Sequence, residues 1–148
     1  MYTPPHFRME DESEMRALMR SYDFALLLIP GEPDLAATHI PMKLADERLV
    51  LIGHVAMANP AAKAIQAGKE AIVVFTGPHA YISPTWYAKP NENVPTWNYA
   101  AVHAFGTLVP LEGVEAERAL SSQIADFESE WRITNLEEKR RAMLERAI

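Results

Sequence analysis

The sequence predicts an α+β fold, an antiparallel barrel with short flanking helices. Five or six segments are rich in β-branched and aromatic residues and are bounded by Pro, Gly, Asn or Asp, which is typical of strands. Four further segments carry helix signals, either in the spacing of their apolar residues or in their capping residues. The helices do not alternate strictly with the strands, and this segregation favours an antiparallel sheet over a doubly wound parallel one.

The length and charge of the chain limit the classes of protein to which it can belong. Its 148 residues fit one domain, residues 1–148, with a single hydrophobic core. The formal net charge of −6 argues against a protein built mainly to bind nucleic acid, because phosphate binding needs clustered Lys and Arg. The absence of cysteine excludes disulfides and thiolate chemistry. We find no secretory signal pattern and no apolar run long enough to span a bilayer, so we expect a cytoplasmic protein without membrane contact.

The first expected elements are a helix and a strand. Asp11, followed three residues later by Glu14, is a typical helix start. Apolar residues then follow the spacing of an amphipathic helix: Met15, Leu18, Met19 and Tyr22. The segment FALLLIP, residues 24–30, is expected to be a buried strand that ends at its Pro.

Two strands and a short helix are expected next. LAATHIPMKL, residues 35–44, should lie at a sheet edge or a bulge, because Pro41 cannot donate to a ladder. ERLVLIGHVA, residues 47–56, is expected to be the third strand. In NPAAKAIQAG, residues 59–68, Asn59 is a favourable N-cap and Gly68 suits the position after the helix.

The second half of the chain is expected to form strands and then helices. EAIVVF (70–75) and HAYIS (79–83) are predicted as strands joined by a turn at Gly77 and Pro78, and 97–109 as one long strand. A helix is predicted over 113–131, with one apolar face: Ala116, Leu120, Ile124, Phe127 and Trp131. A last helix, 134–148, is predicted from a capping Thr134 with Glu137.

The stretch VPTWNYAAVHAFG, residues 94–106, is unusually aromatic for a strand that only packs. Its large side chains should point to one side: Trp97, Tyr99, His103 and Phe105, with Ala101. Its small side chains should point to the other side, where another strand or a ring system could approach closely. Aromatic residues with a polar tip suit a subunit interface or a pocket for a planar ligand. Core packing is an equally valid interpretation of the pattern.

Motifs of catalysis are scarce. The segment from Gly53 to Pro60 joins a strand to the start of a helix, where an anion could bind. Ordinary strand-to-helix connections have the same pattern. The sequence has no glycine-rich phosphate loop that would strengthen the prediction of an anion site. The five histidines have no metal-ligand spacing, so we expect no metal site. No nucleophile motif is present, and catalytic residues are not assigned.

Five segments, in this order and spacing, resemble the PaiB-like family of FMN-binding negative transcriptional regulators. They are MYTPPHF at 1–7, ATHIP at 37–41, GHVAMANP at 53–60, GPHAYISPTWY at 77–87 and VPTWNYAAVHAFG at 94–106. The resemblance extends from residue 1 to about residue 111 and continues more weakly to residue 131.

This resemblance implies a split β-barrel of the FMN-binding type, like that of pyridoxamine-phosphate oxidase, and a homodimer with FMN at the subunit interface. It places one strand along the isoalloxazine ring: Thr38, His39 and Ile40. It places a second group around the ribityl phosphate: Gly53, His54, Ala58 and Asn59. The partner subunit would contribute a third group: Thr96, Trp97, Asn98 and His103.

Two departures from the family pattern bear on these expectations. Many relatives have an Arg where this chain has Met57, which cannot pair with a phosphate; Lys63 could replace that charge. Family members also usually continue past a helix like that of residues 134–148, so the C-terminus is expected to be shortened.

Three functions remain open at this stage. The first is a flavin-binding negative regulator that senses redox state or a ligand; direct DNA contact is not supported by the net charge of −6. The second is an FMN-dependent oxidoreductase that uses a nicotinamide donor. The third is a flavin-free dimeric interaction module.

Overall fold

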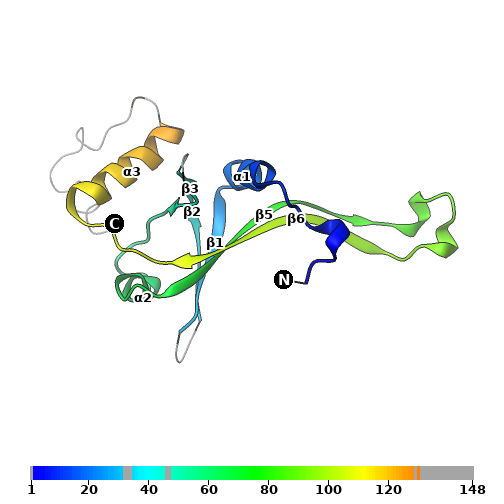
Figure 1. The fold of residues 1–148 in the computed structure, drawn as a ribbon, viewed down its shortest axis with the longest axis horizontal. Helices are drawn as coiled ribbons and strands as arrows, with labels where there is room; N and C mark the ends of the chain where they lie inside the picture. The colour runs from blue at the N-terminus through cyan, green and yellow to red at the C-terminus, as the bar shows by residue number, and fades with distance from the viewer. Residues whose placement is uncertain (1, 32–34, 46–47, 129, 131–148) are drawn as a thin grey trace.

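The computed structural model describes residues 2–31, 35–45, 48–128 and 130 (Figure 1). In chain order its elements are η1 (Pro5–Phe7), α1 (Glu12–Ser21), β1 (Phe24–Ile29), β2 (Ala36–Pro41), β3 (Lys43–Leu44), β4 (Leu51–Ile52), α2 (Ala61–Gln66), β5 (Glu70–Ile82), η2 (Pro84–Trp86), η3 (Pro90–Glu92), β6 (Thr96–Thr107) and α3 (Gly113–Phe127).

The fold is of the α+β class and its strands pair antiparallel, as predicted. Four strands make one sheet in the order β2-β1-β5-β6, and β3 pairs with β4 in a second, two-stranded sheet. Pro41 ends β2 at the edge of the larger sheet, which confirms the expected edge position. Among the described residues no ladder joins the two sheets or closes either of them, so the larger sheet is open.

One face of the larger sheet, here called the inner face, carries the hydrophobic core. Leu27, Ile29 and Phe75 are its most deeply buried large side chains, with exposed fractions of at most 1%. Helices α1 and α2 pack on this face, α1 through Leu18 and Met19 and α2 through two alanines. The small side chains of β6 also point here: Ala100, Val102 and Ala104.

The opposite face, here called the outer face, is apolar and yet exposed. The ladder places Ile72 opposite Phe105 and Val74 opposite His103 on this face. Phe105 is 71% exposed, and Phe24 on β1 is 66% exposed. The sequence of β6 therefore predicted correctly which side chains lie on the same side of the strand. The small side chains pack against the protein's own core, and the aromatic side chains face solvent.

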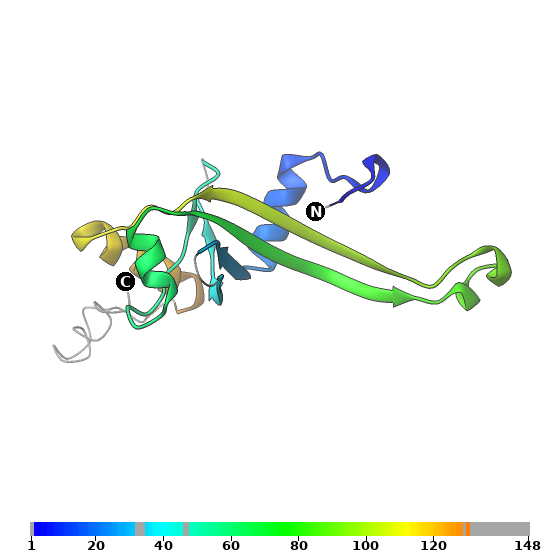
Figure 2. The ribbon, with the colours of Figure 1, turned by 90° about the horizontal axis from the view of Figure 1, so that it is seen from below.

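Strands β5 and β6 run past the rest of the sheet and form a long two-stranded arm, residues 79–99 (Figures 1 and 2). We expected a turn at Gly77 and Pro78 between two strands; instead β5 is continuous, with a register shift between Thr76 and His79. A β-bulge accommodates the extra residue. A Cβ atom on Gly77 would lie 3.1 Å from both the Ala100 carbonyl oxygen and Leu18 Cδ1, so a larger residue would require these neighbours to shift.

The helix ends follow local rules. The hydroxyl and the backbone N–H of Ser13 both donate to Asp11 at 2.7 Å, and these hydrogen bonds hold the pKa of Asp11 below its ordinary value. Gly68 follows α2 with φ of +63°, a conformation that favours glycine.

Helix α3 joins the rest of the fold through buried apolar residues and polar contacts. Ala116 and Leu120 are buried, as predicted. The ammonium group of Lys43 on β3 donates to the Ser122 carbonyl and hydroxyl oxygens at 3.1 and 2.7 Å and to Asp126 at 2.9 Å. All three Nζ hydrogens therefore have partners on α3.

Three expectations differ from the structure or fall outside it. The strand expected over 47–56 is reduced to Leu51–Ile52, which among the described residues pairs only with the two-residue strand β3. Phe127, expected on the apolar face of α3, is 67% exposed at the last residue of the helix, and Gln123 is buried instead. Trp131 and the helix expected over 134–148 lie outside the described residues.

No helix among the described residues is long and apolar enough to cross a membrane.

Phe75→Ala is expected to lower the free energy of unfolding by about 3–5 kcal/mol, because it deletes a fully buried ring from the inner face. Phe7→Ala is the matched control; Phe7 is 72% exposed, and its loss should change stability by less than about 0.5 kcal/mol. Denaturant unfolding followed by circular dichroism measures both. Equal losses in the two variants would contradict the assigned core.

Candidate functional site

Strand β2 has one side of its backbone without a ladder partner among the described residues, since it pairs only with β1. Ile40 is buried and Thr38 is half-buried, both on the inner face. His39 points to the outer face, where its ring stacks on Phe24 with centroids 5.8 Å apart and an interplanar angle of 23°. The predicted strand thus offers main-chain donors and acceptors along its free edge.

Asn59 links β2 to the start of α2. Its Oδ1 accepts a hydrogen bond from the backbone N–H of Ala61, the first residue of α2, at 2.9 Å, although the N-cap position is Pro60 and not Asn59 as predicted. Its Nδ2 donates to Thr38 Oγ1 at 3.2 Å. Two predicted site residues from separate sequence motifs are therefore in direct contact, and the bond to Ala61 orients the amide that joins them.

A hollow of about 510 Å³ lies beside this contact. Asn59, Lys63 and Lys69 supply its polar side chains, and the other described lining residues are apolar or glycine. Because no acidic side chain is among the described lining residues, the two ammonium groups make the hollow suitable for an anionic group. Met57 contributes no charge and is 46% exposed, and Ala58 is also exposed.

Gly53 and His54 follow β4 and approach the end of β2. A Cβ atom on Gly53 would lie 2.8 Å from Met42 Sδ and 3.1 Å from Ile40 Cδ1, so a larger residue here would require the ends of these two flexible side chains to shift. His54 Nδ1 lies 3.0 Å from Gln123 Oε1 on α3. Gln123 Nε2 donates to the carbonyl oxygens of Pro41 and Ile52, at 3.2 and 3.1 Å.

The sequence patterns did not predict Gln123 as a site residue. It occupies the buried stripe of α3, seven residues after Ala116 and three after Leu120, where an apolar residue is usual. A lone amide on an apolar helix face is the signal that could have identified it, because a buried amide needs hydrogen-bond partners.

A larger cavity of about 1450 Å³ lies between the inner face and helices α1, α2 and α3. Its lining is mainly apolar, with Met15, Met42 and Leu120 among its walls. His54 and Gln123 are among its polar lining residues, together with the acidic residues Glu12, Glu112 and Glu117. Apolar walls with a few fixed polar groups are typical of sites for organic ligands.

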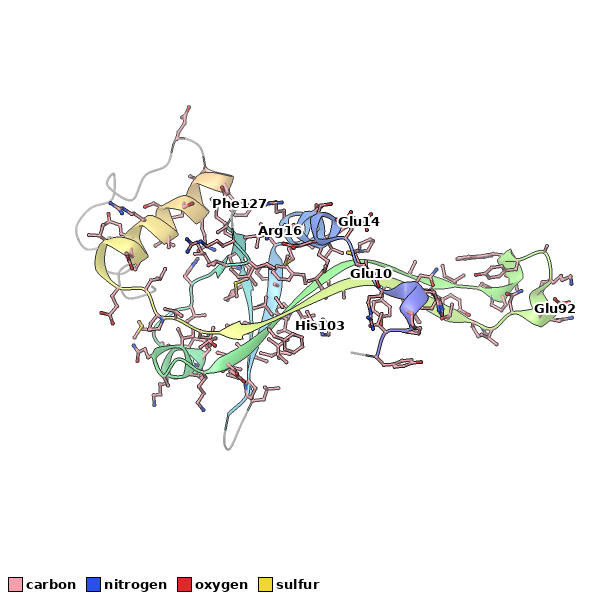
Figure 3. The ribbon with its side chains drawn as sticks, in the orientation of Figure 1. Glu10, Glu14, Arg16, Glu92, His103 and Phe127 are labelled. Atoms are coloured by element: carbon pink, nitrogen blue, oxygen red, sulfur yellow. The ribbon has the colours of Figure 1, made fainter. Side chains whose placement is uncertain are left out.

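The residues expected from a partner subunit lie elsewhere in this chain. Thr96, Trp97 and Asn98 lie on the outer part of the arm, far from β2 and α2 (Figures 1 and 2). Trp97 contacts Tyr81 edge to face, with centroids 6.0 Å apart. His103 lies on the outer face, on the side of the β5–β6 ribbon away from α1 (Figure 3). A single chain therefore does not bring these residues to Thr38 and Asn59.

No group of three or more metal-ligating side chains converges within the part of the chain that the structure describes.

Comparisons with known proteins agree with the sequence motifs. Residues 1–148 match the model of a family described as "Putative FMN-binding domain". The Bacillus subtilis (strain 168) protein named "Protease synthase and sporulation protein PAI 2" is 35% identical over 130 residues, 86% of this chain and 62% of that protein.

Two fungal relatives are uncharacterised. The Saccharomyces cerevisiae protein YKL070W is 36% identical over 84 residues, 51% of this chain and 50% of that protein. The Aspergillus fumigatus protein AFUA_5G13800 is 33% identical over 134 residues, 66% of this chain and 51% of that protein. The chain thus spans between 50% and 62% of the length of these three relatives.

Asn59→Ala is expected to lower the free energy of unfolding by about 1–2 kcal/mol, because it removes the hydrogen bonds to Ala61 and Thr38. Asn59→Asp keeps an oxygen for the bond to Ala61 and loses only the donor to Thr38, so it should cost less. Asn91→Ala, at an exposed position outside the proposed site, is the control and should be neutral. Thermal unfolding of the three variants checks this order; an Asp variant as unstable as the Ala variant would contradict a stabilising bond to Ala61.

Proposed function

Because the chain belongs to this family of FMN-binding domains, we propose that it is a PaiB-like protein that holds FMN at the interface of a homodimer and acts as a negative regulator. The observation that carries the FMN assignment is the family match over residues 1–148. The open sheet and the small β3–β4 sheet would be parts of one split barrel. Three features of the described residues support the flavin site: the free edge of β2, the Thr38–Asn59 contact and the cationic hollow.

These features fit the parts of FMN. The main chain of Thr38, His39 and Ile40 would lie along the polar edge of the isoalloxazine ring, where carbonyl and N–H groups need partners. The phosphate would lie in the hollow with Lys63 and Lys69, which supply the positive charge that Met57 cannot. When bound, FMN supplies the redox chemistry, and the protein binds and orients it.

The exposed outer face and the arm support the homodimer. Apolar patches of this kind usually mark interaction sites, and aromatic residues are enriched at interface cores. In one chain Trp97 is 60% exposed and Tyr99 is 59% exposed. In a dimer, the arm would carry Thr96, Trp97 and Asn98 to the flavin held by the other subunit.

Regulation is proposed to act through a protein partner and not through direct DNA contact. The formal net charge of −6 disfavours binding to phosphates. The chain has a run of three basic residues, KRR at 139–141, which lies outside the described residues. Oxidation, reduction or loss of the flavin would then change the surface that the partner recognises. Strong, salt-sensitive binding of the purified protein to promoter DNA would contradict this mode.

The purified protein is expected to show visible flavin absorption, or to acquire it when FMN is added, and to release FMN on denaturation. Lys63→Ala should weaken FMN binding by about tenfold, the effect of losing a charge-assisted contact, while riboflavin, which lacks the phosphate, should bind as before. Fluorescence titration measures both affinities.

Arg118→Ala removes one positive charge from the exposed side of α3 and is the control. A parent protein that ignores FMN would overturn the proposed function. Equal weakening of FMN and riboflavin in Lys63→Ala would show that Lys63 does not bind the phosphate.

Phe105→Asp is expected to convert the dimer to a monomer, because it places a charge on the exposed outer face, near the end of edge strand β6. Phe7→Asp is the matched control, since Phe7 is 72% exposed and Phe105 is 71% exposed in a single chain. Sedimentation at several concentrations gives the masses. A monomeric parent, or a dimer that Phe105→Asp leaves intact, would argue against this interface.

A further inference from the structure

The buried amide of Gln123 can adopt only one orientation. Gln123 is 5% exposed and is the one buried polar side chain among the described residues. Its nitrogen lies within hydrogen-bond distance of the carbonyl oxygens of Pro41 and Ile52. Carbonyl oxygens only accept, so the NH₂ group must face them and both of its hydrogens are used. The Gln123 oxygen must then face His54.

This orientation determines where His54 carries its proton. The Gln123 oxygen only accepts a hydrogen bond, and it lies 3.0 Å from His54 Nδ1. Nδ1 must therefore carry a hydrogen and donate it. In the neutral ring, the lone pair is then on Nε2, because a neutral imidazole has one donor and one acceptor nitrogen.

The Nε2 atom is available for a ligand. No hydrogen bond joins it to any of the described residues, and His54 lines the 1450 Å³ cavity. A neutral Nε2 can only accept, so its ligand must supply an O–H or N–H group. The phosphate of FMN is largely deprotonated at neutral pH and has few hydrogens to offer, whereas the ribityl chain carries hydroxyl groups.

We propose that Gln123 is a positioning residue that holds His54 in the Nδ1–H tautomer, so that Nε2 accepts a hydrogen bond from a ribityl hydroxyl of the bound flavin. This inference rests on the proposed function for the identity of the ligand. It assigns His54 to the ribityl chain and leaves the phosphate to the lysines of the hollow. It also adds α3 to the elements that shape the flavin site.

The tautomer can be measured without flavin. Nitrogen-15 NMR of the neutral His54 ring should show a protonated Nδ1 and an unprotonated Nε2. Gln123→Met has a side chain of similar length without hydrogen-bonding groups, and it should abolish this preference. A parent protein with hydrogen mainly on Nε2 would overturn the proposal.

Flavin affinity tests the role of the tautomer. His54→Asn keeps an N–H near the position of Nδ1, and so the bond to Gln123, but has no atom at the position of Nε2. It should weaken binding of FMN by about five- to tenfold, the effect of one hydrogen bond. Riboflavin should weaken equally, and lumiflavin, which lacks the ribityl chain, should be unaffected. His6→Asn is the control and should change none of the three affinities.

A double-mutant cycle separates positioning from general support of the fold. Gln123→Met alone should weaken FMN binding, but it should add little in the His54→Asn background, because Gln123 acts through His54. Additive losses would show that Gln123 only stabilises the fold and would overturn the positioning role. His54→Asn is expected to remain folded because it keeps the contact with α3, so the test does not depend on the stability of Gln123→Met.

The ligand series identifies the contact. Loss of FMN affinity alone in His54→Asn would place the phosphate at Nε2, and loss of lumiflavin affinity would place the ring there; either overturns the ribityl assignment. A parent that binds FMN while His54→Asn binds it equally well overturns this inference and leaves the proposed function intact. A parent that binds no flavin overturns both.

Discussion

The fold depends on the fact that its four-stranded sheet has two apolar faces while the described helices bury only one of them. Leu27 and Phe75 lie at the centre of the covered inner face, under α1 and α2. The outer face has the same alternation of side chains but leaves Phe24 and Phe105 in solvent. Exposed apolar area of this kind is unfavourable in water. The aromatic composition of β6 and the projecting arm are understandable if this face is completed by another chain.

Polar contacts connect α3 to the ends of β2 and β4 and to His54. Lys43 holds the helix through Ser122 and Asp126. Gln123 contacts the last residue of β2, the last residue of β4 and the ring of His54. A buried amide with all its hydrogen bonds satisfied is specific in geometry, since any shift leaves a carbonyl without a partner. The position of α3 and the geometry around His54 are therefore coupled by contact.

Several features were predictable because their causes are local. Pro41 cannot donate to a ladder, so its strand was expected at a sheet edge or a bulge, and β2 lies at the edge of the larger sheet. Asp11 caps α1 through Ser13, and the side chain of Asn59 bonds the first residue of α2, in each case a neighbour two residues away. The turn expected at Gly77 was wrong because the pairing of β5 with β6 continues through it, and a bulge absorbs the extra residue. That outcome depends on a strand more than twenty residues later, which a local pattern does not contain.

Residue patterns alone were enough to predict the α+β class, the Asp11 cap, the alternation of large and small side chains along β6, and membership of an FMN-binding family. Which side of β6 is buried, the contact of Asn59 with Thr38 and the contact of Gln123 with His54 could be found only in the three-dimensional structure. The physical reason is sequence separation. The Asn59–Thr38 contact spans 21 residues and the Gln123–His54 contact spans 69, so each exists only after the sheet has brought distant segments together.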